Sequence, residues 1–225
     1  MNSFIVRCQW PFIFFMLFLC ISCTRIRPIK SVGFSGLNQK VCLQPFFITP
    51  YRFIHAIEAE LPGGSQVMLI GITVVDPVVG KFRSAVMTIE GMVLFDASWD
   101  NTVVVYRALP PFDNKHFANS MMDDVRFIYF PPQGTFRTLG NLDDGSTICR
   151  YYGEGREIVD VILHSDNSWE VEQYSSCRKI VRKVKAISMQ NKIPGVIELS
   201  VHRAQKYFLR MKLISAEPVL LGEIF

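Results

Sequence analysis

Residues 66–91 read QVMLIGITVVDPVVGKFRSAVMTIEG and predict a long β-hairpin. β-Branched residues are frequent in both arms, 66–75 and 81–90, and such residues favour strands over helices. Asp76 and Pro77 favour a turn between the arms, because proline fixes φ and cannot donate a hydrogen bond to a sheet. The hairpin and the alternating segments around it predict a meander of antiparallel strands.

The tip of this hairpin carries Pro77, Val78 and Val79, whereas the tips of turns are usually polar. Leaving one valine exposed forgoes roughly 1.5–3 kcal/mol of burial, so exposing two requires a reason. Two interpretations stay open at this point. Either the valines fold back onto the rim of the sheet, or the tip contacts a membrane or a lipidated partner.

The composition is that of a folded β-rich chain with an apolar interior. Of the 225 residues, 49% are hydrophobic and 18 are phenylalanine, which excludes intrinsic disorder. The net charge of +4 is too small to argue for nucleic-acid binding. No cluster of cysteine and histidine has the spacing of a zinc site, so the sequence predicts neither a metal nor another cofactor.

The N-terminus predicts export. Arg7 precedes the apolar run 11–19, and a small residue, Ser22, follows. A basic start, a short apolar core and a small residue are typical of a secretory signal, which we place at residues 1–22. The core is shorter than the roughly 20 residues that span a bilayer, although an uncleaved anchor remains the alternative.

Cys23 directly after this signal resembles the acylated cysteine of a bacterial lipobox, with Cys20 as a weaker alternative. Lipidation of Cys23, with palmitate or similar chains, would tether the protein firmly to a membrane. In enteric bacteria, an aspartate directly after the acylated cysteine retains a lipoprotein in the inner membrane, and here that residue is Thr24. The resemblance therefore implies the periplasmic face of the outer membrane. We expect residues 23–45 to be the lipidated N-terminus and a linker, and residues 46–225 to form one lipid-binding domain.

One amphipathic helix is predicted over residues 114–130. Asn114 provides an N-cap, and Pro131 ends the helix. Apolar residues recur along one side and must cover the concave face of a sheet. The helix is either an ordinary core helix or a lid whose flexible side chains repack around a guest. The candidate cavity and lid residues are Phe117, Met121, Met122, Val125 and Ile128.

No catalytic residue is assigned, and we do not expect an enzyme. The histidines are scattered, and the chain has neither a Gly-x-Ser-x-Gly elbow nor a phosphate-binding glycine loop. The aspartate pairs at 123–124 and 143–144 are interpreted as solvated. Cys42, Cys149 and Cys177 leave the disulfide pairing open: two of them could be joined, or all three could be free thiols.

The order of elements resembles the LolA/LolB lipoprotein-carrier superfamily, and most closely the LolB-like lipoproteins. The resemblance rests on Cys23, on the hairpin 72–82, on the helix 114–130 with its aromatic-proline end, and on a last hairpin, 193–213. It implies a mainly β (α+β) fold, a half-open antiparallel β-barrel of about ten or eleven strands with a helical lid over an apolar cavity.

The resemblance also implies acyl-chain binding without catalysis, with a periplasmic LolA-like donor and the outer membrane as partners. Val78 or Val79 holds the place of an exposed leucine in the protruding loop of LolB. Burying about ten methylenes contributes about 8 kcal/mol, near micromolar affinity. The alternatives are a carrier of another hydrophobic molecule, such as a glycolipid or a polyene lipid, or a structural lipoprotein packed solid by Phe82, Phe95 and Trp99.

Overall fold

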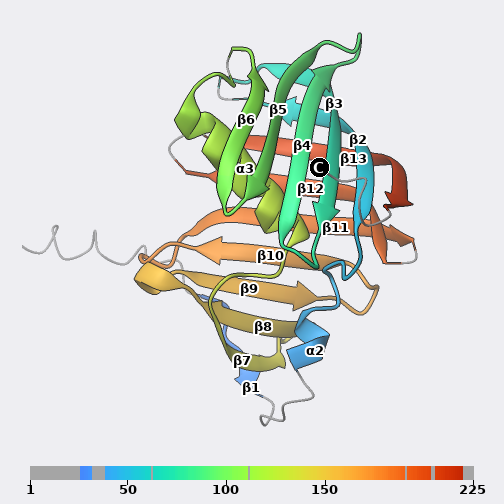
Figure 1. The fold of residues 1–225 in the computed structure, drawn as a ribbon. Coiled ribbons are helices and arrows are strands. Elements are labelled where there is room, and N and C mark those ends of the chain that lie inside the picture. The colour runs from blue at the N-terminus through green and yellow to red at the C-terminus, as the bar shows by residue number, and fades with distance from the viewer. Residues whose placement is uncertain are drawn as a thin grey trace, which may run out of the picture.

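The computed structural model describes residues 26–31, 39–61, 63–110, 112–190, 192–203 and 206–219. These residues form one antiparallel sheet of 13 strands in the order β1-β7-β8-β9-β10-β11-β12-β13-β2-β3-β4-β5-β6, shown in Figure 1. The signal at residues 1–22 and the lipidation site Cys23 lie outside the described residues. No helix among the described residues is long and apolar enough to cross a membrane.

The strands are β1 (Lys30–Ser31), β2 (Tyr51–Glu60), β3 (Gln66–Asp76), β4 (Lys81–Thr88), β5 (Val93–Asp100), β6 (Thr102–Ala108), β7 (Thr135–Asn141), β8 (Thr147–Tyr152), β9 (Ile158–Leu163), β10 (Trp169–Tyr174), β11 (Ile180–Gln190), β12 (Ile193–His202) and β13 (Lys206–Pro218). The helices are α2 (Gln39–Cys42), α3 (Lys115–Tyr129) and the short 3-10 helix η3 (Glu154–Arg156).

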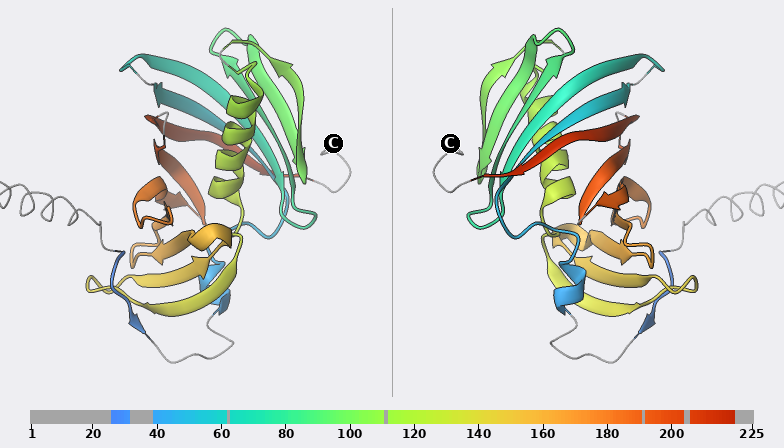
Figure 2. Two further views of the ribbon diagram at one scale, coloured as in Figure 1. Left: turned by 90° about the vertical axis from the view of Figure 1, so that its left-hand side faces the viewer. Right: turned by 90° about the vertical axis from the view of Figure 1, so that its right-hand side faces the viewer.

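The predicted fold class is confirmed, with more strands than expected. Among the described residues the sheet is open, because its first and last strands, β1 and β6, do not pair with each other. It bends around α3, which crosses its concave side (Figure 2). The prediction of ten or eleven strands was too low against the 13 described. One reason is that β1 has only two residues and therefore shows no alternation in the sequence.

The predicted central hairpin is confirmed as β3 and β4. Its register pairs Thr73 with Ser84 and Asp76 with Lys81. The carboxylate of Asp76 accepts hydrogen bonds from the backbone N–H of Val78 at 2.9 Å and of Val79 at 3.3 Å. This side-chain turn closes the loop locally, which is why the sequence alone was enough to predict it.

The helix α3 also follows its sequence signals. The side chain of Asn114 accepts hydrogen bonds from the backbone N–H of His116 and Phe117, at 2.9 and 3.3 Å. Phe130 is extended and ends the helix, because a residue before proline avoids the helical region.

The segment 23–45, expected to be a linker, contributes two elements to the domain. Strand β1 pairs with β7, and α2 carries Cys42, which forms a disulfide with Cys149. Cys177 is a free, exposed cysteine. The partners lie about a hundred residues away in the sequence, so no local pattern could show that this segment is ordered.

Candidate functional site: a cavity between the helix and the sheet

A cavity of about 550 Å³ lies between α3 and the concave faces of β2, β3, β4, β12 and β13. Most of its wall is apolar and comes from alternate residues of the strands, such as Ile57, Leu69, Val86, Leu199 and Met211. Alternation places these side chains on one face of the sheet, and the helix supplies the opposite wall. The volume is within the 300–1,000 Å³ that is usual for small-molecule sites.

The structure brings four of the five predicted lid residues together. Phe117, Met121, Val125 and Ile128 all line the cavity, whereas Met122 is fully buried and is not part of its wall. A residue one position after Met121 is rotated by about 100° around the helix axis, which turns Met122 toward the neighbouring core. Met122 therefore packs in the core beside the cavity.

The cavity reaches one end of the sheet, which we call the mouth end. Leu61 and Val67, which flank the turn between β2 and β3, line it, as does Phe117 in the first turns of α3. The other end is filled with aromatic rings: Phe82 lies 6.0 Å from Trp99 and 5.4 Å from Phe130 between ring centroids. The cavity is therefore closed at the end where α3 terminates.

The packed-barrel alternative expected Phe82, Phe95 and Trp99 to meet across the interior. Phe82 and Trp99 are instead direct partners on the adjacent strands β4 and β5, and Phe95 packs on Phe112 with 5.8 Å between centroids. These rings cover parts of one sheet face and leave the cavity unfilled.

The hairpin tip does not fold back onto the sheet. Val78 is 66% exposed and Val79 is 56% exposed. The tip lies at the closed end of the sheet, because β3 runs from Gln66 at the mouth end to Asp76 at the tip. Further exposed apolar side chains, Met68, Ile89 and Met92, lie at or next to the strand ends at the mouth end.

Asp124 fastens the helix to the sheet. Its carboxylate accepts a hydrogen bond from the guanidinium of Arg182 on β11 at 2.6 Å and another from the hydroxyl of Tyr207 on β13. Arg182 also donates to the side-chain oxygen of Gln173 at 3.1 Å. The sequence reading of Asp124 as solvated was wrong. Its place between Met121 and Ile128 on the apolar helix face was the available signal.

Three polar side chains stand in the part of the cavity wall that β2, β3 and β4 form, and their neighbours there are apolar. His55 is 2% exposed, and the hydroxyls of Thr73 and Ser84 are hydrogen-bonded to each other at 3.2 Å. Burial lowers the pKa of His55 to about 4, so its imidazole is neutral at pH 7. Sequence reasoning treated His55 as one of several scattered histidines and missed its neighbours across the sheet.

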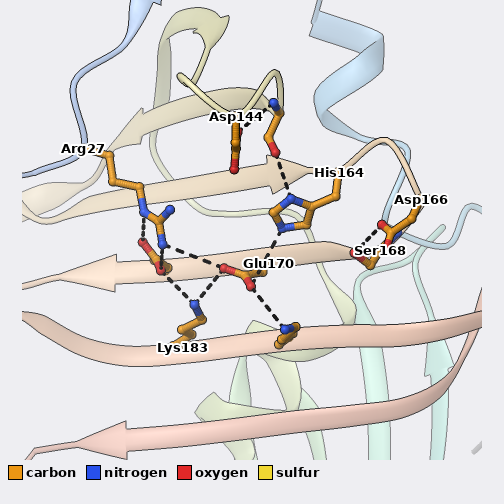
Figure 3. A network of polar contacts seen from close by, with 10 residues as sticks. Arg27, Asp144, His164, Asp166, Ser168, Glu170 and Lys183 are labelled. Atoms are coloured by element: carbon orange, nitrogen blue, oxygen red, sulfur yellow. Dashed lines mark hydrogen bonds and ion pairs between the residues drawn. The ribbon is translucent and has the colours of Figure 1, made fainter.

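A second polar cluster lies on the opposite, outer face of the sheet, as Figure 3 shows. Arg27 donates two hydrogen bonds to Glu172, at 3.2 and 2.9 Å, and Lys183 lies 2.7 Å from Glu170. Tyr174 donates to Glu172 at 2.6 Å. Burial alone would raise the pKa of Glu172, but these donors hold it below its usual value. This cluster pairs its charges internally and fastens the N-terminal segment to β10.

Among the described residues, no group of three or more histidine, cysteine, aspartate or glutamate side chains could hold a metal ion. The acidic residues of the cavity wall are Asp123 and Asp124, and Asp124 is already held by its partners.

Comparisons with known proteins show the fold. No family model matches the sequence, and no curated protein matches it. A crystal structure of a LolA superfamily protein from Nitrosomonas europaea superposes with a TM-score of 0.54 and 11% identity, covering 84% of this chain and 96% of that chain. An outer membrane lipoprotein-sorting protein domain from Vibrio parahaemolyticus gives a TM-score of 0.47 at 5% identity, over 81% and 90% of the two chains. The open sheet wrapped around a helix is therefore a LolA-like fold.

Proposed function

We propose that the protein is a non-catalytic carrier of the bacterial envelope, which binds acyl chains of lipids or lipoproteins in its cavity and passes them to a membrane. The observation that carries the proposal is the cavity of about 550 Å³ with a mostly apolar wall under α3. Apolar guests bind such a wall by burial alone and need no reactive group. The LolA-like fold supports the same function.

The proposed anchor is Cys23, and the structure limits its distance from the domain. Arg27 is held by its two hydrogen bonds to Glu172. Cys23 is four positions before Arg27, and an extended chain spans at most about 14 Å over four positions. A lipidated Cys23 would therefore keep the domain close to the outer membrane, on a tether much shorter than the 23 residues of the segment 23–45.

The loop of Pro77, Val78 and Val79 is the proposed membrane contact. Its two valines are exposed on a turn that the Asp76 carboxylate stabilises, so they are presented by a well-defined loop. Delivery would place a short apolar tip in the interface of the bilayer, where each exposed valine recovers part of its burial energy. The partner that supplies the cargo would be a soluble periplasmic donor of the LolA type.

Lipid extraction from the purified full-length protein tests the carrier proposal. We expect mass spectrometry to find bound acyl chains at close to one guest per protein, and extraction of no lipid would contradict the proposal. The identity of the guest separates a lipoprotein or phospholipid carrier from a carrier of another hydrophobic molecule, such as a glycolipid.

The contact loop is tested by replacing both Val78 and Val79 with glutamate. We expect transfer of bound lipid to vesicles to slow at least tenfold while the melting temperature stays within about 2 °C, because both side chains are exposed. The double variant of Met68 and Ile89 to glutamate, at the mouth end, is the matched comparison. Slower transfer in that variant alone would move the membrane contact to the mouth end.

A further inference from the structure

We propose that His55, Thr73 and Ser84 form a hydrogen-bonding site for an uncharged oxygen deep in the cavity, so that the preferred guest is an oxygenated acyl chain rather than a plain hydrocarbon chain. The inference rests on the proposed carrier function and narrows its cargo. We call these three residues the inner polar site.

The strand register gathers the inner polar site on one sheet face. His55 is opposite Gly71, two residues before Thr73 on β3, and Thr73 is opposite Ser84 on β4. Diagonal neighbours on adjacent strands lie about 7–8 Å apart, with their Cβ atoms somewhat closer, so the two side chains border the same part of the cavity. All three residues line the same cavity.

Gly71 lies directly across the strand pair from His55 and allows Ile57 to pack closely beside the imidazole. It stands between His55 and Val86 in the register, and it also lines the cavity. A Cβ added to Gly71 would lie 2.6 Å from Cδ1 of Ile57. The side chain of Ile57 therefore covers Gly71 and packs next to His55 in the cavity wall.

The inner polar site has unused hydrogen-bonding capacity. His55 is 2% exposed, and burial is the cause of its lowered pKa, with no contribution from a hydrogen bond to a described residue. The bond between Thr73 and Ser84 uses one of their two hydroxyl protons, so one donor and further acceptors stay available. The hydroxyl of Tyr129, another cavity residue, is also buried without a partner. A buried polar group without a partner is costly, so a guest oxygen that pairs with Tyr129 or with the inner polar site would bind more tightly than a plain chain.

The guest oxygen that fits is neutral and able both to donate and to accept. The pKa of His55, lowered by burial to about 4, leaves one ring nitrogen as a donor and the other as an acceptor at pH 7. A hydroxyl group matches this set, whereas the end of a plain chain leaves it unsatisfied. Thr73 lies six residues along β3 from Val67 at the mouth end, which is a distance of roughly 20 Å. The guest oxygen would therefore lie along the acyl chain, away from the end at the mouth.

A competition between oleic acid and ricinoleic acid tests the inference. The two have the same length and double bond, and ricinoleic acid adds one hydroxyl beyond the middle of the chain. The full-length protein, stripped of lipid, is incubated with an equimolar mixture, and the bound acids are extracted and quantified. We expect about three- to tenfold more ricinoleic acid bound, the effect of one buried hydrogen bond.

Variants assign the preference to the inner polar site. The ratio of bound ricinoleic acid to bound oleic acid should fall to about one in His55→Leu and in the double variant Thr73→Val with Ser84→Ala. It should recover in part in His55→Gln, which restores a donor and an acceptor. His202→Leu, a matched change of an exposed histidine outside the cavity wall, should keep the preference. Thermal unfolding of each variant checks that it folds.

The outcomes separate the two proposals. Equal binding of the two acids by the native protein overturns the inner polar site and leaves the carrier function standing. Binding of neither acid overturns both. A preference that persists in His55→Leu and in the hydroxyl variant shows that another part of the wall selects the oxygen, and also overturns the inference.

Discussion

The two halves of this sheet are both built from antiparallel strands joined by turns, but one half is tightly packed and the other borders a cavity. In the packed half, β7 to β11, all six residues of β10 are buried, because both faces of the sheet are covered. Phe46, beside α2, packs near Trp169 with 6.2 Å between ring centroids, and the segment around Arg27 covers the outer face. In the hollow half, β2 to β6 with β12 and β13, the concave face borders the cavity.

The half for which we propose the function is the hollow half, in which the apolar side chains of one sheet face border a cavity. The packed half pairs its buried charges: Arg150 donates two hydrogen bonds of 2.7 Å to Asp160. Among the described residues, buried polar atoms without a partner occur in both halves: the hydroxyl of Tyr129 belongs to the cavity wall, and the hydroxyl of Tyr151 and the indole N–H of Trp169 lie in the packed half. The contrast therefore lies in the cavity, which lowers the stability of the hollow half.

The largest expected effect comes from the disulfide of the packed half. Replacing both Cys42 and Cys149 with alanine opens a loop with a sequence separation of 107 residues. Chain entropy predicts a loss of about 4.7 kcal/mol in the free energy of unfolding, measured with urea. Cys177→Ser is the control and should change little, because that thiol is exposed and free. A loss below about 1 kcal/mol in the double variant would show that the packed half does not depend on this bond.

The next effect concerns the link between the halves. Asp124→Ala removes the acceptor of Arg182, from the packed half, and of Tyr207, from the hollow half. Removing one partner of a buried ion pair should lower the free energy of unfolding by about 4 kcal/mol. The control is Asp123→Ala, the neighbouring half-buried carboxylate, with less than about 1 kcal/mol expected. Equal effects of the two changes would remove the special role of Asp124.

A third prediction uses pH to test the burial of His55 in the hollow half. The pKa of His55 falls from its ordinary value of 6.5 to about 4 in the folded protein. Between these values the unfolded chain binds a proton that the native protein does not, so stability is lost as pH falls. The loss attributable to His55 should reach about 3 kcal/mol. His55→Leu should flatten the stability profile between pH 6.5 and 4, and an unchanged profile would assign the acid sensitivity to other groups.

The smallest effect tests the cavity by overpacking. Ala59 lines the cavity, whereas Ala186 is fully buried in the packed half. Ala186→Phe should cost about 2 kcal/mol, because Ala186 is fully buried and a ring there overpacks its neighbours. Ala59→Phe should cost less than about 1 kcal/mol while it reduces lipid binding. If the two changes cost the same, the hollow half is no less tightly packed than the other.

The sequence predicted the elements whose signals are local. The turn at Asp76, the cap at Asn114 and the end of α3 before Pro131 each depend on side chains within a few residues of the backbone they fix. The apolar face of α3 was predicted as well, although Met122 packs in the core and is not part of the cavity wall. The membrane role of Val78 and Val79 and the lipidation of Cys23 stay predictions.

Contacts between distant segments were missed for one reason. Arg27 meets Glu172, and Cys42 meets Cys149, across more than a hundred residues. The segment 23–45 therefore looked like a linker, and Asp124 looked solvated although its partners lie on β11 and β13.

By itself, the sequence determined a mainly β chain with one amphipathic helix, because alternation, turn residues and caps act within a few residues. The tertiary structure alone decided which sheet face the helix covers, which cysteines join and where the cavity lies. It also decided that His55, Thr73 and Ser84 share one wall, because strand register sets which distant side chains become neighbours.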